Sequence, residues 1–168
     1  MANPPFETVV ETHGALVWRV CRALLGEADA DDAWSETFLA ALRAYPGLAA
    51  DSNVAAWLVT IAHRKALDSI RATGRRAVPI AQLPAAAATP TGSAAEHHDL
   101  WQAVAALPFK QRSALVHRHL VGLSYEEIAD LLASSPAAAR RSVSDALASL
   151  RRDHHLRPEP PSPTEGRP

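Results

Sequence analysis

The stretch from residue 121 to 152 constrains the fold more than any other, because it encodes two short helices separated by a tight turn. Ser124 and Glu127 have the spacing of a capping box, in which the serine hydroxyl and the glutamate carboxylate each accept a backbone N–H. Ser135 predicts a second helix start, and Pro136 suits its first position, where no N–H donor is needed. At helical spacing, the apolar residues expected to be buried are Ile128, Leu131, Leu132, Val143, Leu147 and Leu150.

Two capped helices with almost no linker form the pattern of a helix-turn-helix, whose second helix lies in the major groove of DNA. The same pattern also occurs in helical bundles that do not bind nucleic acid. The net charge of −1 gives the chain no overall positive field. DNA binding therefore requires local clusters of basic residues or a partner protein.

The composition favours an all-α protein. Hydrophobic residues make up 48% of the 168 residues and aromatic residues only 5%, and few β-branched residues alternate as they would in a sheet. Cys21 is the single cysteine, which excludes an internal disulfide and a cysteine-based zinc site, and its apolar helical surroundings predict a core residue. No stretch has the pattern of a signal peptide or a membrane span, so we expect a cytoplasmic protein without membrane insertion.

Residues 77–95 contain no charged residue and three prolines, which is typical of a linker between two helical lobes. The end of the chain is rich in proline and predicts a disordered tail. The expected organisation is an N-terminal lobe at 6–76, the linker at 77–95, a C-terminal lobe at 96–156 and the tail at 157–168. Helices are expected near residues 6–25, 29–45, 53–73, 97–106 and 108–121, before the capped pair.

Charge is segregated along the N-terminal lobe although it sums to nearly zero. Residues 1–45 hold seven acidic side chains against three arginines, whereas residues 46–76 hold five basic side chains against two acidic ones. An acidic helix suits a basic protein surface, and a basic helix end suits phosphate. Charged surfaces of this kind are also common where they are simply solvated.

Several blocks of sequence together point to one family. Residues 29–38 read DADDAWSETF, residues 56–68 AWLVTIAHRKALD, residues 107–112 LPFKQR and residues 122–129 GLSYEEIA. In order and spacing they resemble the blocks DAEDxxQETF, AWLxxIAxNxALD and LPxxxR…GLSYxEIA of the extracytoplasmic-function (ECF) sigma factors. The resemblance covers roughly residues 10–152.

The resemblance implies two small helical lobes, a sigma region 2 bundle and a region 4 helix-turn-helix, joined by a flexible linker. It implies a protein that binds core RNA polymerase and directs promoter-specific transcription initiation by reading −10 and −35 elements. Such a protein is not an enzyme and needs no cofactor or metal. The partners it implies are core polymerase, promoter DNA and an anti-sigma factor.

By the same resemblance, the acidic second helix docks on the clamp helices of the largest polymerase subunit. The residues that the resemblance assigns to this docking surface are Asp29, Asp32, Ser35, Glu36 and Leu39. Trp34 and Phe38 of the same helix could belong to the core instead. For the −10 element, the loop before the third helix holds an unstacked base and basic side chains hold phosphates. These residues are Asp51, Ser52, Asn53, Arg64, Lys65, Arg71, Arg75 and Arg76; Trp57 is expected in the core instead.

The helix beginning at Ser135–Pro136 is expected to enter the major groove at the −35 element. Arginine there can pair with guanine through two hydrogen bonds. The expected DNA-contacting residues are Lys110, Arg118, Ala137, Ala138, Arg140, Arg141, Ser144 and Asp145. Arg151 and Arg152 instead suit the negative end of the helix dipole.

Several positions depart from the family pattern. Ser35 replaces a glutamine and Arg64 an asparagine, and in the helix pair Ala133 stands where the turn glycine is expected and Ser134 where an apolar residue is expected. In the second helix the arginine is shifted one place earlier, onto Arg141, and Asp145 replaces a basic residue. A carboxylate facing DNA is repelled unless it accepts from cytosine or pairs with an arginine, and Arg141 is within helical reach. We therefore expect weak or unusual −35 recognition.

Two other classes of protein compete with this interpretation. A stand-alone helix-turn-helix regulator would bind DNA without polymerase, but it would have no use for the acidic block at 29–38. A degenerate sigma-like protein would act as an interaction module that sequesters a partner. An enzyme has the least support, because the histidines are scattered and His117 and His119, at i and i+2, lie on different helix faces.

Overall fold

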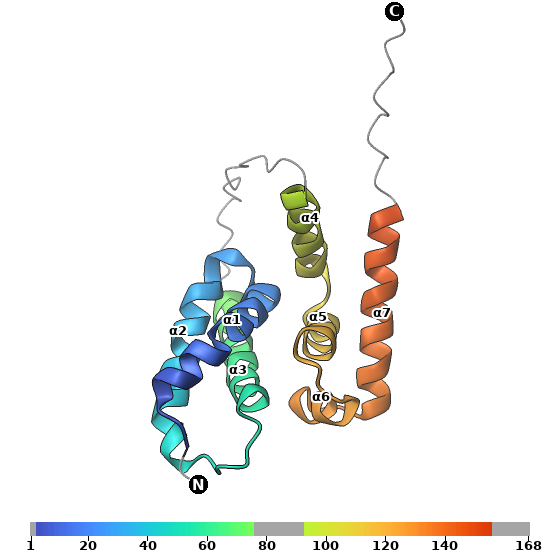
Figure 1. Cartoon of the computed structure of the whole chain (residues 1–168). Helices are drawn as coiled ribbons and strands as arrows, with labels where there is room; N and C mark the ends of the chain where they lie inside the picture. The colour runs from blue at the N-terminus through green and yellow to red at the C-terminus, as the bar shows by residue number, and fades with distance from the viewer. Residues whose placement is uncertain (1–2, 76–92, 156–168) are drawn as a thin grey trace, which may run out of the picture.

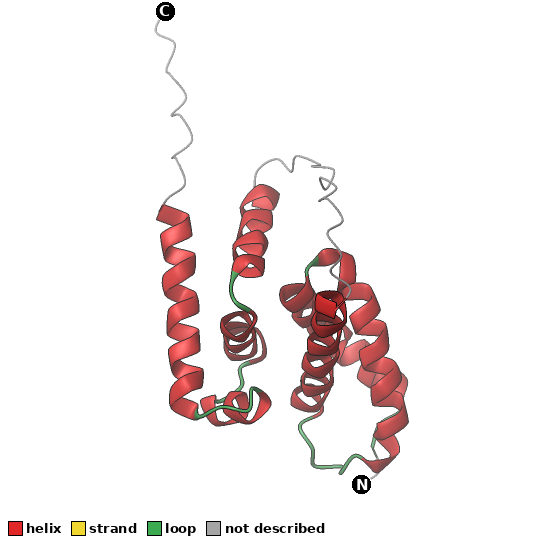
Figure 2. Cartoon of the chain, turned by 180° about the vertical axis from the view of Figure 1, so that it is seen from behind, coloured by secondary structure: helices red, strands yellow, loops and turns green. Residues whose placement is uncertain are grey.

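The computed structural model describes residues 3–75 and 93–155, and within these ranges every regular element is helical, as predicted (Figure 2). The N-terminal lobe contains α1 (Phe6–Leu25), α2 (Glu27–Ala44), the short 3-10 turn η1 (Tyr45–Gly47) and α3 (Val54–Arg75). The C-terminal lobe contains α4 (Ser93–Ala106), α5 (Phe109–Val116), the π-helical turn η2 (His117–Val121), α6 (Tyr125–Leu131) and α7 (Pro136–His155).

The three helices of the N-terminal lobe enclose a core of large side chains. Gly26 is the single residue between α1 and α2, and its φ of 88° lies in the left-handed region that glycine adopts without a steric cost. Leu24, Phe38 and Leu58, one from each helix, are buried in the same cluster. Cys21 is buried there as predicted, and burial raises the pKa of its thiol to about 11. This packing determines which faces of α2 and α3 remain outside.

The core of the C-terminal lobe is built from smaller side chains. Ala129 of α6 and Ala139 and Ala146 of α7 are buried around Ile128 and Val143. Alanine at these contacts lets the helix backbones approach one another closely, and α6 lies across the foot of α7 (Figure 1). The second helix of the pair therefore stands on the outer side of the molecule.

The two lobes pack against each other. Figures 1 and 2, taken from opposite sides, both show α5 next to the N-terminal lobe and α7 away from it. Val116, at the end of α5, belongs to the buried core of the N-terminal lobe. Arg112 donates a hydrogen bond of 2.8 Å to the carbonyl of Leu24, which lies in the last turn of α1. The sequence predicted two lobes but gave no sign that they touch.

Three of the predicted boundaries need correction. Residues 93–95, expected in the linker, belong to α4, and α2 begins at Glu27 rather than near residue 29. The helix expected at 108–121 changes to a π-helical turn at His117, which ends at Gly122 with a φ of 83°. The remainder of the predicted linker, 77–92, and the predicted tail, 157–168, lie outside the described residues.

Candidate polymerase-binding and DNA-binding surfaces

The residues expected to dock on polymerase share one exposed face of α2. Asp29, Asp32, Ser35, Glu36 and Leu39 are all exposed, while Ala33, Thr37 and Phe38 of the same helix are buried. At 3.6 residues per turn the five positions fall within about 120° of arc, opposite the core. Leu42 extends the same face and is 50% exposed, close to the 55% of Leu39. We call these six residues the α2 stripe; sequence analysis missed Leu42, whose apolar character suited the core equally well.

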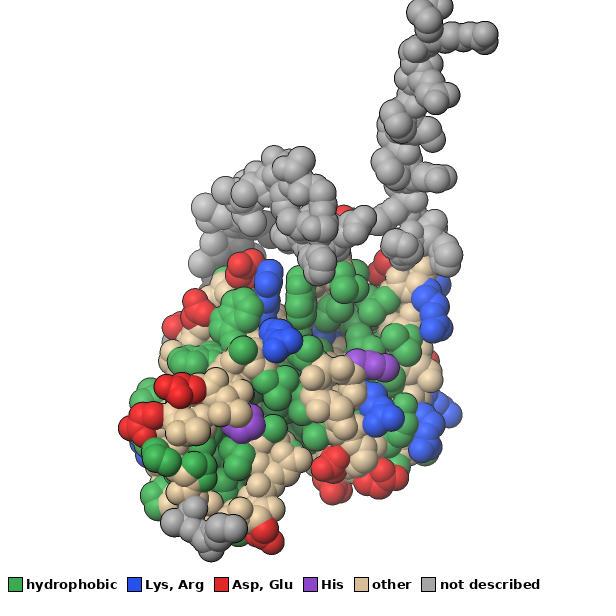
Figure 3. Space-filling view, in the orientation of Figure 1, with side chains coloured by type: hydrophobic (Ala, Val, Ile, Leu, Met, Phe, Trp, Pro, Cys, Tyr) green, Lys and Arg blue, Asp and Glu red, His purple; other side chains and the backbone are tan. Residues whose placement is uncertain are grey.

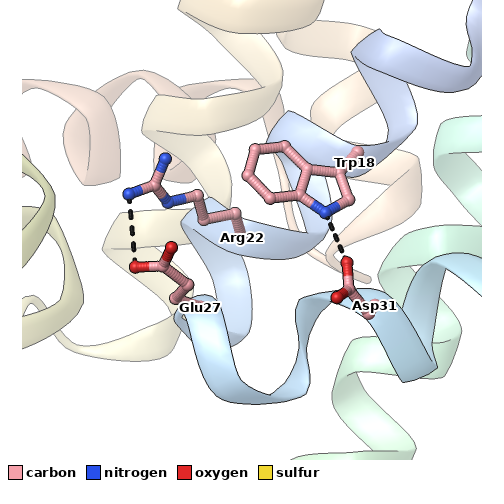
Figure 4. A network of polar contacts seen from close by, with 4 residues as sticks. All are labelled: Trp18, Arg22, Glu27 and Asp31. Carbon is pink, nitrogen blue, oxygen red and sulfur yellow. Dashed lines mark hydrogen bonds and ion pairs between the residues drawn. The ribbon is translucent and has the colours of Figure 1, made fainter.

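The other two acids of this region have a structural role instead. Glu27 forms an ion pair of 3.5 Å with Arg22, and Asp31 accepts a hydrogen bond of 2.7 Å from the Trp18 indole (Figure 4). Both contacts tie the start of α2 to α1. Among the described residues, no ion pair or side-chain hydrogen bond involves Asp29 or Asp32. These two carboxylates are therefore available to a partner.

The loop before α3 holds the predicted −10 residues Asp51, Ser52 and Asn53. The Asn53 side-chain oxygen accepts the backbone N–H of Ala56 at 3.1 Å, so it caps the start of α3. This use of the oxygen leaves the side-chain NH₂ group to donate outward. Asp51 and Asn53 are exposed and Ser52 is half-buried, so the loop presents polar groups to solvent.

The basic residues of α3 differ in their surroundings. Arg64 and Arg71 are exposed, whereas Lys65 is half-buried and forms an ion pair of 3.6 Å with Glu36 of the α2 stripe. Arg75 ends the helix without a described side chain, and Arg76 lies outside the described residues. Trp57 packs on Tyr45 at the edge of the core, with ring centroids 6.3 Å apart, as the core assignment predicted.

The predicted caps of the helix-turn-helix are present. Ser124 Oγ accepts the N–H of Glu127 at 3.2 Å, and Glu127 Oε2 accepts the N–H of Ser124 at 2.7 Å. Ser135 Oγ accepts the N–H of Ala138 at 3.2 Å, and Pro136 is the first residue of α7. Ala133, at the expected glycine position, has a φ of 47°, so it adopts the left-handed conformation that glycine favours.

The predicted −35 residues divide into two groups around α7. Lys110, Ala137, Ala138, Arg141 and Asp145 line one open hollow. Arg141 and Asp145 are neighbours there, but no ion pair joins them in the described structure. Ser144 is exposed nearby on the same helix. Figure 3 shows basic side chains along the outer edge of the molecule, over α7.

Arg118 and Arg140 form the second group, held by an aromatic ring that sequence analysis missed. The guanidinium carbons lie 4.8 Å and 4.7 Å from the centroid of the Tyr125 ring. Arg118 also donates to the carbonyl of Leu123 at 2.9 Å. A cation over an aromatic face is attracted by the ring quadrupole, so Tyr125 restricts where both arginines lie.

Two buried histidines meet where the lobes touch. His117 Nε2 lies 3.1 Å from His63 Nδ1, and the His63 ring stacks on Phe109 with centroids 5.7 Å apart. Burial lowers the pKa of His63 to about 4 and that of His117 to about 3, with nearby Arg64 and His63 respectively adding to the effect. Both rings are therefore neutral near pH 7. His117 is buried and His119 is exposed, so the two lie on different faces as their i+2 spacing predicted, whereas the pairing of His63 with His117 had no signal in the sequence.

The described residues include no group of three or more histidine, cysteine or acidic side chains that could hold a metal ion. None of the described helices is long and apolar enough to cross a membrane. The surfaces that remain are an acidic stripe with apolar residues, a polar loop beside a basic helix, and a helix-turn-helix. Together they have the charge and shape expected of a two-lobed DNA-binding protein that also binds another protein.

Comparison with known proteins identifies the family to which the chain belongs. Residues 9–76 match the family model "Sigma-70 region 2" and residues 97–150 match "Sigma-70, region 4". The chain is 36% identical over 156 residues to the ECF RNA polymerase sigma factor SigD of Mycobacterium tuberculosis, covering 85% of this chain and 74% of that one. It is 32% identical over 151 residues to SigC of the same species, covering 82% of this chain and 76% of the relative.

Solved structures have the same fold. The sigma factor RpoE of Bartonella quintana, in complex with the anti-sigma factor NepR, aligns with a TM-score of 0.74 at 21% identity, covering 91% of this chain and 98% of that one. CnrH, in complex with the cytosolic domain of CnrY, aligns with a TM-score of 0.65 at 25% identity, covering 91% and 89%. The chain belongs to the ECF family of sigma factors. It binds core RNA polymerase and directs promoter-specific transcription initiation.

Proposed function

We propose that the α2 stripe is the surface by which this sigma factor docks on the clamp helices of the largest polymerase subunit. The observation that carries this assignment is the exposure of two unpaired carboxylates, Asp29 and Asp32, on the same face as Leu39 and Leu42. Apolar contacts flanked by charges are the composition of a specific protein interface. The carboxylates steer the encounter with a basic partner surface, and the leucines supply the area that is buried.

For the −10 element, we assign the loop at 51–53 and the basic residues of α3. The free amide NH₂ of Asn53 can donate to an unstacked base, and Arg64 and Arg71 can contact the backbone phosphates of the melted strand. Lys65 can contact DNA only when its ion pair with Glu36 is broken. Glu36 is itself part of the α2 stripe. Polymerase docking through Glu36 would therefore release Lys65 for phosphate.

For the −35 element, we assign the outer face of α7. Arg140, Arg141 and Lys110 supply the positive charge, and Ala137 and Ala138 allow a close approach to the bases. Asp145 lines the same hollow as Arg141, which lowers the local positive potential. This arrangement supports a −35 contact that depends on polymerase for most of its affinity.

An anti-sigma factor is a further partner that we infer. The support is that two proteins of the same fold, RpoE and CnrH, were solved in complexes of which the first contains an anti-sigma factor. The protein itself acts by binding, in the cytoplasm, and leaves the chemistry of transcription to polymerase.

The docking assignment is tested by transcription in vitro with purified core polymerase and a promoter library. Asp32→Arg is the test variant, because Asp32 has no partner within the chain. Glu11→Arg, which reverses an exposed charge on α1, is the matched control. We expect Asp32→Arg to lower core affinity and transcript yield about tenfold, since opposing charges at an interface become like charges. Equal activity of the two variants would refute the docking assignment.

A further inference from the structure

The exposed face of α7 carries a carboxylate beside basic side chains. Val143 and Ala146 are buried on one side of the helix, whereas Arg141 and Asp145 are exposed on the other. Residues four apart in an α-helix are separated by about 40° of arc, so Arg141 and Asp145 point in nearly the same direction. Both line the open hollow at the start of α7, together with Lys110 of α5. Asp145 therefore belongs to the surface that we assign to DNA and not to the core.

The Asp145 carboxylate has no structural partner in the part of the chain that the structure describes. No ion pair or side-chain hydrogen bond there involves it, although Arg141 precedes it by one helical turn. An arginine four residues before an acidic residue is the weaker order for an ion pair within a helix. Asp145 also lies in the middle of α7, whereas the helix dipole favours acidic residues only in the first turn. Both of its oxygens are therefore free to accept hydrogen bonds from a ligand.

A carboxylate can accept hydrogen bonds but cannot donate them, and this limits the bases that it can contact in the major groove. Guanine presents two acceptors there, and thymine presents an acceptor and a methyl group, so neither base offers a donor. Adenine has an amino donor, but its N7 acceptor lies beside that donor and repels a carboxylate. Cytosine presents only the N4 amino donor. Of the four bases, cytosine is therefore the one that suits Asp145.

We propose that Asp145 is a specificity-determining residue of this sigma factor, which accepts a hydrogen bond from the N4 amino group of a cytosine in the −35 element. Arg141 pairs with a nearby guanine through two hydrogen bonds. The two residues are about 6 Å apart along the helix axis, which corresponds to roughly two base-pair steps of DNA. The small, exposed side chain of Ala137 lets the start of α7 approach the bases closely. This inference rests on the assignment of α7 to the −35 element.

The carboxylate makes the −35 contact weak and selective at the same time. Repulsion between Asp145 and the DNA phosphates lowers affinity for every promoter, and a hydrogen bond to cytosine offsets that loss only where cytosine is present. Discrimination of this kind excludes wrong sequences instead of strengthening the right one. Lys110 and Arg141, which line the same hollow, supply the positive charge that keeps the contact with DNA favourable.

The test is transcription in vitro by the holoenzyme, with core polymerase and a promoter library randomised across the −35 element. Each promoter carries a barcode in its transcript, so the bases selected at each position can be counted. Wild type is compared with Asp145→Asn, because asparagine has nearly the same shape but both donates and accepts, which suits adenine. Asp153→Asn is the matched control, since Asp153 is also exposed on α7 but lies outside the hollow.

We expect wild type and Asp153→Asn to prefer cytosine at one −35 position by about fivefold or more. Asp145→Asn should lose that preference, favour adenine at the same position and keep the preferences at the other −35 positions. If Asp145→Asn selects the same bases as wild type, or gains activity equally on all sequences, Asp145 does not read a base and the proposal is wrong. If wild type shows no preference anywhere in the −35 element, the assignment of α7 fails, and this inference fails with it.

Discussion

The N-terminal lobe has two candidate binding surfaces, and they differ in whether their charged side chains are engaged within the chain. The α2 stripe faces solvent, with Leu39 55% exposed and two carboxylates unpaired. The α3 surface is also exposed at Arg64 and Arg71, but Arg64 shares a hollow with Glu127 and Asp130 of the C-terminal lobe, and Lys65 pairs with Glu36. The difference indicates that the surface for polymerase is available as it stands, whereas two basic residues of α3 lie beside acidic side chains of the same chain.

The same contrast explains how a chain of net charge −1 can act on DNA. Its basic residues are not gathered into one field but are distributed over α3 and α7. On α3, Arg64 shares a hollow with Glu127 and Asp130, and Lys65 pairs with Glu36. On α7, Arg140 lies over the Tyr125 ring and Arg141 lines the same hollow as Asp145. Affinity for DNA therefore depends on local contacts and on polymerase rather than on long-range attraction.

The largest effect is expected from acid, which should weaken the contact between the lobes and leave the α2 stripe unchanged. His63 and His117 have pKa values of about 4 and 3 where the lobes pack together, below the ordinary value of 6.5 that they would regain in water. Lowered values mean that the contact is fully stable above pH 6.5 and weakens as the pH falls, by up to about 1.4 kcal/mol per pH unit for each ring. A protonated His117 would also carry an N–H at Nδ1, which has no acceptor in the described structure.

The measurement is the radius of gyration between pH 7 and pH 5, where most carboxylates of ordinary pKa remain ionised. The charged groups around the pair are Arg64, beside His63, and Arg112, over the Phe109 ring; both are cationic and would repel protonated histidines. His119→Gln is the control and should keep the wild-type profile. A radius that stays constant down to pH 5 would contradict this prediction.

A single added charge is expected to disrupt binding through the α2 stripe. Leu39→Lys removes an exposed apolar contact from the α2 stripe, and we expect core affinity to fall about tenfold, as for a central interface residue. Leu100 of α4 is 53% exposed, almost as much as Leu39, so Leu100→Lys is a matched control with no expected loss. Titration of labelled core polymerase with each variant measures the effect. Equal losses of core affinity from the two variants would contradict the prediction, because they would show that Leu39 is no more important for the interface than Leu100.

A smaller effect is expected at α7, where an aromatic ring positions two arginines. Tyr125→Leu removes both cation–π contacts, each worth roughly 0.5–1 kcal/mol at an exposed site, and we expect −35-dependent transcription to fall several-fold. Tyr125→Phe keeps the ring and should keep the activity. Comparing promoters with and without a −35 element separates this role from a loss of stability. A Tyr125→Leu variant that loses the same fraction on both promoters would show that the ring is structural only.

The sequence predicted what depends on neighbours in the chain and missed what depends on distant contacts. The capping box at Ser124 follows from local spacing, and the residues exposed on α2 were indicated by the resemblance of residues 29–38 to a family block, so both were predictable. The pairing of His63 with His117 joins residues 54 positions apart, so no local pattern indicates it. The cation–π contact between Tyr125 and Arg140 likewise depends on how α6 crosses α7, and the spacing of residues along the chain does not specify that crossing. The assignments to polymerase and DNA remain predictions.

The smallest effect is expected in the turn between α6 and α7, and it concerns stability alone. Ala133 has a φ of 47°, and a residue with a Cβ adopts this conformation at a cost of about 1–2 kcal/mol. Ala133→Gly removes that cost but adds backbone entropy to the unfolded chain, so a net gain of roughly 0.5–1 kcal/mol is expected. Ala137→Gly, at an exposed position in the first turn of α7, should instead destabilise, because glycine is a poorer helix former than alanine. Chemical denaturation of both variants measures the difference. If Ala133→Gly also destabilises, the turn is not strained, and the absence of the family's glycine carries no cost for this helix-turn-helix.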